Sequence, residues 1–334
     1  GCIYQLDLII YQYVNTLVKY DIVCYKYVLG VTHMETEINT TFAVLDADLN
    51  CEYKTIAHKD RPEFGALDKN EKKTGKIHRG IFHNHDGYEL LLLVNGEMNY
   101  YTEGDGKKIE QGDLVCLSPY EFHRGELLTL QIYDRIVINI HERIMKSLCS
   151  EMTDLFFFFY RVSANKLNII HLNEAEISEF IWYANKLQNS LSSIQYGSDI
   201  LAKTYVQQLL VMINRYIEDN KEFQHTGIMP SLVVDTFSYI DEHICEKISL
   251  HSLSQHIHHN ETYISRCFKK ITGITLQQYI IAKKITLAQK YLREGYSPCD
   301  ACFMTGFNDY SNFSRTFSKQ AGISPKQYQL MNRY

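Results

Sequence analysis

The sequence has no run of about 18 uncharged apolar residues, which a membrane-spanning helix needs. Its nine cysteines are scattered without the spacing of a disulfide framework, so we expect reduced thiols. No repeat of solenoid length is present. The 334 residues, 45% hydrophobic and 22% charged, therefore predict a soluble protein of two domains in the cytoplasm, without a membrane partner.

A methionine is also missing from the first 33 positions, where Tyr, Ile and Val are dense and turn residues are few. Residues 1–33 are either a genuine extension from a larger chain or a translated leader upstream of a start at Met34. We favour the second explanation and leave this segment out of the fold prediction. We expect three further parts, at 34–170, 171–227 and 228–334.

Charge is distributed unequally along the chain. Residues 228–334 hold 12 Lys and Arg against 8 Asp and Glu, a net charge of +4, whereas the whole chain has a net charge of −5. A basic segment on an acidic protein indicates a local site for a polyanion rather than a surface that binds everywhere. The alternative is an ordinary solvated helix face.

Short strands are predicted between about Thr40 and Ile140. The apolar run 89–94 ends at an Asn-Gly pair, the signal of a tight hairpin turn, and residues 97–102 alternate as its partner strand. Strands spaced in this way predict a small barrel or sandwich.

Helical spacing begins after Asn173, with amphipathic helices expected at 174–189 and 198–219. An apolar stripe on the second helix either forms a dimer interface or packs on the protein's own barrel, and these alternatives stay open. The stripe consists of Tyr205, Leu209, Met212 and Tyr216.

Two helix-turn-helix patterns follow, at 249–270 and 297–319, and a long helix at about 274–293 connects them. The second helix of each pair is basic, which is the pattern of a helix that enters the major groove. Polar residues at helical spacing form the expected outward face and are the candidate DNA contacts: Thr262, Ser265, Arg266, Lys269, Tyr310, Ser311, Asn312, Arg315 and Lys319. Arg suits a guanine edge and Asn an adenine edge, whereas the lysines suit phosphates.

The run 305–317, followed by 321–328, resembles the C-terminal signature of the AraC/XylS transcription regulators. The resemblance covers about 100 residues. It implies that both recognition helices enter adjacent major-groove turns on one face of the DNA.

Two further segments, from His83 to Gly96 and from Gly112 to His123, resemble the two motifs of the cupin fold. Regulators of the AraC type often carry such a domain as a sensor, so both halves of the chain are consistent. The resemblance implies a metal site at His83, His85, Glu89 and His123. Fe, Mn, Ni or Zn suits these ligands. The favoured alternative, with no cofactor, is an effector pocket lined by a set of polar side chains: His83, His85, Tyr88, Glu89, Tyr100 and His123.

The predicted fold is therefore α+β, with an N-terminal cupin-like β-barrel followed by helices, and a C-terminal all-α domain with two helix-turn-helix units joined by a long helix. The effector-binding domain is expected at 34–170, a helical dimerisation and linker segment at 171–227, and the DNA-binding domain at 228–334. The predicted function is a transcription regulator, not an enzyme, that binds double-stranded DNA as a homodimer and responds to a small molecule. RNA polymerase is a candidate partner, and the sequence leaves open whether the regulator is an activator or a repressor. A carbohydrate is the expected effector by family analogy alone. Two alternatives are a metal-dependent cupin enzyme with a DNA-binding tail and a constitutive DNA-binding protein with a dimerising barrel.

Overall fold

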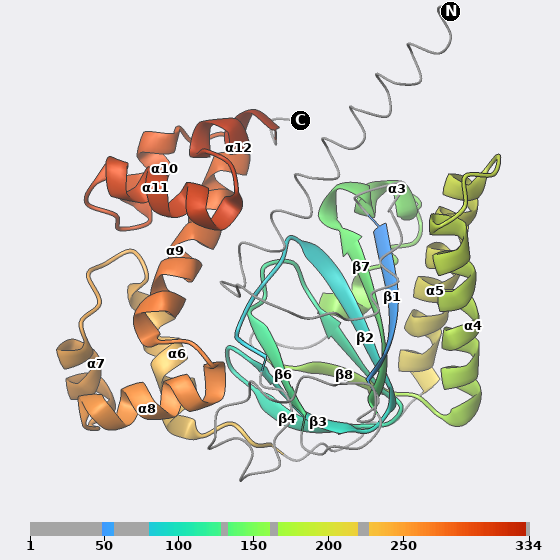
Figure 1. Cartoon of the computed structure of the whole chain (residues 1–334), viewed down its shortest axis with the longest axis horizontal. Coiled ribbons are helices and arrows are strands. Elements are labelled where there is room, and N and C mark those ends of the chain that lie inside the picture. The colour runs from blue at the N-terminus through green and yellow to red at the C-terminus, as the bar shows by residue number, and fades with distance from the viewer. Residues whose placement is uncertain (1–48, 57–79, 128–132, 161–165, 220–226, 332–334) are drawn as a thin grey trace, which may run out of the picture. The chain divides into compact units, whose positions relative to one another are not determined.

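The structure, a computed structural model, describes the chain in five parts: residues 49–56, 80–127, 133–160, 166–219 and 227–331 (Figure 1). The prediction for residues 1–33 lies outside these parts. The described chain divides into two compact units. One unit contains the described residues up to 237 together with 266–274, and the other contains 238–265 and the described residues from 275 onward.

Eight strands of the first unit form two antiparallel sheets. The larger sheet has the order β1 (Leu49–Ile56), β7 (Tyr133–His141), β2 (Gly87–Asn95), β5 (Asp113–Leu117) and β8 (Asn168–His171). The smaller has the order β4 (Gly106–Glu110), β3 (Glu97–Thr102) and β6 (His123–Leu127). Within the described residues no strand ladder joins the two sheets, so the predicted barrel is an open pair of sheets.

Strand β2 contributes to two separate apolar layers because successive side chains of a strand point to opposite faces. Leu90 and Leu92 lie in the core that the large sheet shares with the helices. Leu91 and Leu93 lie in a second core with residues of the small sheet. The strand ends at Asn95, and Gly96, with a φ of 104°, makes the turn into β3. The predicted hairpin is confirmed.

Helices α4 (Glu174–Leu191) and α5 (Ser198–Asp219) run side by side along the outer face of the large sheet (Figure 1). Asn173 begins α4 with a capping box, in which its side chain accepts from the backbone N–H of Glu176 while the Glu176 carboxylate accepts from that of Asn173. Three short helical segments line the same core: Glu142–Ile144, α3 (Met145–Leu148) and Phe157–Tyr160.

The apolar stripe of α5 packs on its own domain. Leu209 is fully buried, and Met212 and Tyr216 keep less than a tenth of their surface exposed. Tyr205 is partly buried against the same core. Three of the four residues are therefore covered within one chain, as the alternative of packing on the protein's own barrel predicts. A dimer interface that includes this stripe stays an untested prediction.

Among the described residues, no helix is long and apolar enough to cross a membrane. The C-terminal region contains seven helices within the described residues. They are α6 (Ser231–His243), α7 (Leu250–Ile257), α8 (Glu261–Thr272), α9 (Leu276–Arg293), α10 (Pro298–Met304), α11 (Tyr310–Ala321) and α12 (Pro325–Met331). Helices α7 and α8 form the first predicted helix-turn-helix unit, α10 and α11 form the second, and α9 connects them.

Candidate nucleic-acid interface and effector site

The second helix-turn-helix unit is built on an aromatic core. Phe313 and Phe317, one turn apart on α11, are fully buried against α9 and α10. Asp309 begins α11 by accepting a hydrogen bond from the backbone N–H of Asn312, and Gly322 ends it in the left-handed conformation, with a φ of 74°. Because the two rings fix which face of α11 is buried, the opposite face is left for a ligand.

That opposite face of α11 is the one predicted to contact DNA. Tyr310, Ser311, Asn312, Arg315 and Lys319 are all exposed. The Arg315 Nε donates to the backbone carbonyl of Ser311 at 3.3 Å, which holds the guanidinium along the helix surface. An exposed amide and guanidinium one turn apart can each read a base edge in a major groove.

Helix α8 repeats this arrangement in the first helix-turn-helix unit. The Asn260 side chain accepts a hydrogen bond from the backbone N–H of Thr262 at 2.9 Å and so caps the start of the helix. Ile264 and Phe268 are fully buried, whereas Thr262, Arg266 and Lys269 are exposed. Ser265 is partly exposed. Both predicted recognition helices therefore present their predicted faces, with the lysines toward the C-terminal ends.

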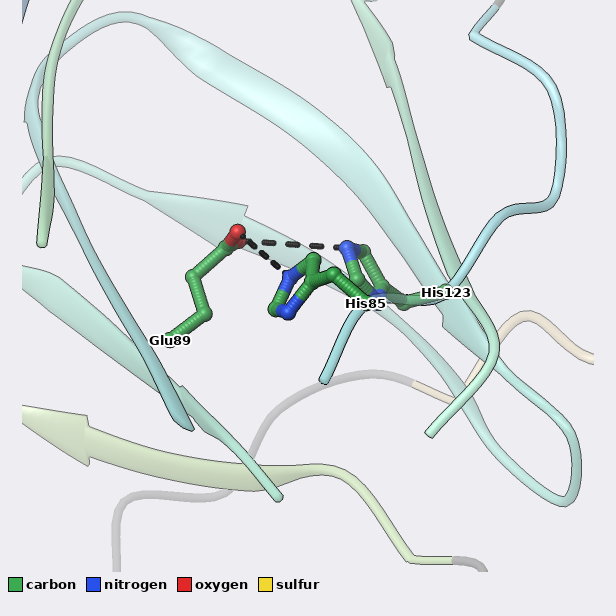
Figure 2. Close-up of side chains that lie close together, drawn as sticks. All are labelled: His85, Glu89 and His123. Carbon is green, nitrogen blue, oxygen red and sulfur yellow. Dashed lines mark hydrogen bonds and ion pairs between the residues drawn. The ribbon is translucent and has the colours of Figure 1, made fainter. Parts of the chain in front are cut away.

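A separate polar cluster lies between the two sheets of the N-terminal unit, and Figure 2 shows its centre. The rings of His85 and His123 both point at the carboxylate of Glu89 (Figure 2). The His85 Nε2 lies 3.0 Å from Glu89 Oε2, and the His123 Nε2 lies 3.9 Å from Glu89 Oε1. Glu89 is on β2 of the large sheet and His123 begins β6 of the small sheet, so both sheets contribute.

Two more predicted residues join this cluster. The Tyr100 hydroxyl on β3 donates to Glu89 Oε1 at 3.4 Å, and its ring is stacked 6.1 Å from that of His123. His83 pairs with His123 through backbone hydrogen bonds, which brings their ring centres to 4.4 Å. The effector cluster, as the group is called below, consists of His83, His85, Glu89, Tyr100 and His123.

Each histidine of the effector cluster is held by a backbone carbonyl. The Nδ1 atoms of His83, His85 and His123 lie 2.9 to 3.0 Å from the carbonyl oxygens of residues 81, 87 and 121. A carbonyl can only accept, so each Nδ1 carries the proton. In a neutral ring the Nε2 then has a free lone pair. This nitrogen can bind a metal or accept a hydrogen bond from a ligand.

Burial and the carboxylate set the protonation of the effector cluster. Burial lowers the pKa of His123 to about 3 and lowers that of His83. Burial also opposes the charged form of His85, but the hydrogen bond and charge of Glu89 outweigh it and raise the pKa of His85. Against its own burial, the hydrogen bond with His85 and the charges of His123 and His85 hold the pKa of Glu89 well below its usual range. Burial thus favours the neutral rings of His83 and His123, whereas Glu89 favours the charged form of His85.

Tyr88 lies elsewhere, although it was predicted to line the same pocket. Its ring packs against Phe156 and Phe159, with ring centres 4.7 and 4.6 Å away, and its hydroxyl meets that of Tyr160. Tyr88 and Glu89 are consecutive in β2, so their side chains point to opposite faces of the sheet. The structure thus brings five of the six predicted effector residues together and places Tyr88 in the helical core.

Three residues of the effector cluster also have the geometry of a metal site. One ligand atom from each of His85, Glu89 and His123 lies within 4.8 Å of the other two. Two imidazoles and a carboxylate suit Fe, Mn, Ni or Zn. The predicted fourth ligand, His83, lies beside His123 without belonging to this group.

The comparisons with known proteins match both halves of the chain. Residues 76–210 match the family described as AraC-like ligand binding domain, and residues 253–331 match a helix-turn-helix domain family. The regulator YbfI of Bacillus subtilis is 25% identical over 235 residues, which are 69% of this chain and 80% of YbfI. The regulator SAR0107 of Staphylococcus aureus is 23% identical over 250 residues, 73% of this chain but 31% of its own length. Both are named as uncharacterized HTH-type transcriptional regulators.

A solved structure of ToxT from Vibrio cholerae also matches, with 13% identity and a TM-score of 0.35 over 86% of this chain and all of ToxT. A likeness this low says nothing about ligands. The two family matches and the named relatives establish the class: the chain belongs to the AraC family of transcription regulators, with an N-terminal ligand-binding domain and a helix-turn-helix DNA-binding domain.

One residue was missed by the sequence analysis, namely Lys284 in the middle of α9. It is buried, and its ammonium donates to the backbone carbonyls of Glu246 and Gly306. The signal was present, because Lys284 stands one turn after Ile280 and one turn before Ala288, in the phase of the buried face.

Proposed function

We propose that the chain is a sequence-specific transcription regulator whose DNA binding is set by a small molecule held at the effector cluster. The observation that carries this proposal is the pair of outward, polar and basic faces of α8 and α11, each defined by buried residues on the opposite side of its helix. The lysines of these faces contact phosphates, and Arg266, Asn312 and Arg315 read bases.

The chemistry of the effector cluster limits what it binds. A carboxylate and neutral imidazole nitrogens accept hydrogen bonds, so the ligand presents hydroxyl or amine donors. The His85 side chain keeps 15% of its surface exposed, against 2% for His123, so the ligand approaches from the side of His85. A carbohydrate has such donors, but it remains a prediction, because neither the relatives' names nor the cluster single one out.

The effector acts only if it binds one state of the regulator more tightly than another, since equal affinity for both states shifts nothing. A homodimer that recruits RNA polymerase in the cytoplasm and activates transcription completes the proposal. Each of these further features is an expectation for this chain.

The experiment that tests DNA recognition is selection of bound duplexes from a random pool with the full chain at a stated salt concentration. We expect enrichment of a site with two submotifs about one helical turn apart. Bulk binding that depends on salt but enriches no sequence, with and without candidate effectors, would contradict the proposal.

The effector cluster is tested by calorimetric titration with a panel of hydroxylated and amine ligands. Glu89→Gln removes the acceptor charge at the cluster, whereas Tyr88→Phe changes the neighbouring residue on the opposite face of β2. We expect Glu89→Gln to abolish binding of a ligand that the wild type binds and Tyr88→Phe to leave it intact. Equal losses in both variants would show that the ligand binds elsewhere.

A second candidate function is favoured by the grouping of His85, Glu89 and His123 within metal-ligand distance. It makes the domain a metal-dependent cupin, acting as an enzyme or sensing the metal itself. Such a metal would polarise a bound oxygen ligand, while His85, Glu89 and His123 hold it. Metal analysis of protein purified without chelators discriminates: stoichiometric Fe, Mn, Ni or Zn that His123→Ala removes supports this candidate, and metal-free protein that takes up none contradicts it.

A further inference from the structure

We propose that Lys284 is a positioning residue that holds the two helix-turn-helix units at one separation, so that both recognition helices fit a single spacing on DNA. This inference rests on the proposed function and adds a residue that contacts neither DNA nor effector. The juxtaposition that carries it is one buried ammonium between the loop that leads into the first helix-turn-helix unit and the turn within the second.

Lys284 contacts two segments of the DNA-binding domain that are far apart in sequence. Its Nζ donates to the carbonyl of Glu246 at 3.1 Å, in the segment between α6 and α7 that leads into the first unit. The same Nζ donates to the carbonyl of Gly306 at 3.0 Å, in the turn between α10 and α11 of the second unit. The ring of Phe307 lies 5.9 Å from the ammonium, within the range of a cation–π contact.

Because Lys284 is buried, its ammonium requires both carbonyl acceptors. Lys284 keeps 8% of its surface exposed, and burial lowers the pKa of its ammonium. A buried charge persists in a fold where it is hydrogen-bonded, and here the acceptors are backbone carbonyls that cannot rotate away. If either loop moved, the ammonium would lose a partner in a place that water reaches poorly.

Gly306 shows how closely the two loops approach. Its φ is 73°, and a Cβ built on it would collide with the carbonyl of Cys245 and lie 2.7 Å from the Lys284 Nζ. The turn of the second unit therefore rests directly on the loop that precedes the first unit, with Lys284 at the contact.

Helix α9 is not sufficient to fix the geometry. Its 18 residues span about 27 Å at 1.5 Å per residue, and each helix-turn-helix unit is attached at one end. A contact part-way along α9 that joins both units prevents them from rotating independently about the helix ends. The two recognition helices then keep the offset that adjacent major-groove turns, about 34 Å apart, require.

The test compares Lys284→Met, which keeps the length of the side chain but removes its charge, with Lys290→Met on the exposed face of the same helix. The full chain binds duplexes that carry both selected submotifs, one submotif, or both with one or two inserted base pairs. For Lys284→Met we expect affinity for the two-submotif duplex to fall by at least about 10-fold, while affinity for a single submotif stays within about twofold of wild type. The inserted base pairs should reduce the affinity of this variant less than they reduce that of the wild type. Lys290→Met should behave as wild type, and Lys284→Arg should recover part of the loss. Equal losses on single and double sites, or no loss, would overturn the proposal.

A second pair of variants covers the case in which Lys284→Met fails to fold. Gly306→Ala introduces the collision described above, while Gly295→Ala carries the same left-handed strain at a φ of 97° with nothing within 4 Å of the added carbon. We expect Gly306→Ala alone to reproduce the spacing effect. The same phenotype in Gly295→Ala would overturn the proposal, because it would trace the effect to local strain.

A distance measurement keeps this inference separate from the proposed function. Spin labels carried by non-natural amino acids at Tyr263 on α8 and at Gln320 on α11 report the separation of the two units without DNA. Lys284→Met should broaden the distance distribution, and an unchanged distribution would overturn the role of Lys284. If the wild type selects no DNA site, the proposed function fails, and this distance alone decides on Lys284.

Discussion

At the scale of single residues, hydrogen bonds to backbone carbonyls determine what the side chains can do. Three histidines of the effector cluster donate hydrogen bonds from Nδ1 to backbone carbonyls, and the Nε2 atoms of His85 and His123 face the Glu89 carboxylate. The same device appears in the DNA-binding domain, where carbonyls hold the Lys284 ammonium. The chemistry of both sites therefore depends on backbone positions as much as on side-chain identity.

Arg266 and Arg315 give the first prediction, which also belongs to single residues. Each is exposed on the outward face of its recognition helix. Arg266→Ala and Arg315→Ala should each cost about 1–3 kcal/mol of binding free energy and relax the preference at one submotif only. Repeating the sequence selection with each variant checks this, and relaxation of both submotifs by one substitution would contradict it.

Tyr216 gives a prediction about pH. Its hydroxyl donates to Glu179 Oε2 at 2.7 Å, and burial, with that hydrogen bond, raises the pKa of Tyr216. Because the folded pKa lies above the unfolded value of about 10, this stabilisation is complete below pH 10 and is lost as the pH rises further. Tyr216→Phe should cost about 1 kcal/mol of unfolding free energy at pH 8 and little at pH 11. Urea unfolding at both pH values measures this, and Tyr205→Phe on the same helix is the control. An equal cost at the two pH values would be inconsistent with it.

At the scale of elements, hydrophobic period and turn chemistry made most of the fold predictable. The β2–β3 hairpin followed from the apolar run and its Asn-Gly pair. Helix α11 carries equally local signals, namely a capping residue, two phenylalanines one turn apart and a closing glycine. These signals are local, so they need no knowledge of the rest of the chain.

What the sequence left open or missed at this scale is what surrounds a buried side chain. The stripe of α5 has the same pattern whether it packs on a sheet or on a second chain, and the sequence left both open. Tyr88 was grouped with Glu89 because β2 is buried on both faces, which removes the alternation that would have separated them. Lys284 was passed over because a lysine in a helix is usually solvated.

Leu209 tests whether the apolar stripe of α5 packs only on its own domain. Because Leu209 is fully buried within one chain, Leu209→Ala should lower the unfolding free energy by about 2–5 kcal/mol and leave the oligomeric state unchanged. Chemical unfolding and light scattering measure the two quantities. Trp182→Ala is the matched control, because Trp182 on α4 keeps 51% of its surface exposed. Dissociation of an oligomer without loss of stability would support the interface assignment.

At the scale of the whole molecule, the unequal distribution of charge directs a polyanion to the DNA-binding domain. The chain as a whole is acidic, with a net charge of −5, while the residues from 228 onward are basic. Repulsion by the remainder of the chain lowers binding of nucleic acid outside the two recognition helices.

This distribution predicts the salt dependence of DNA binding. Each phosphate contact contributes about 0.9 to the slope of the logarithm of affinity against the logarithm of salt concentration. Lys269→Ala and Lys319→Ala should each reduce the slope by about that amount and weaken binding similarly on specific and random duplexes. Lys290→Ala should leave the slope unchanged. Titrations between 50 and 200 mM salt, about the range over which such effects are large, check this, and an altered sequence preference in either lysine variant would contradict it.

The two-faced burial of β2 also bears on how such a sensor acquires a new ligand. Glu89 shares one face with Leu91 and Leu93, while the residues between them support the helical core. Substitutions at alternate positions can thus change specificity one side chain at a time without disturbing the layer beneath α4 and α5. A single inserted residue would instead exchange the two faces and place a carboxylate among phenylalanines. Substitutions in this strand can therefore change ligand specificity, whereas insertions cannot. A library for directed evolution should randomise every second codon.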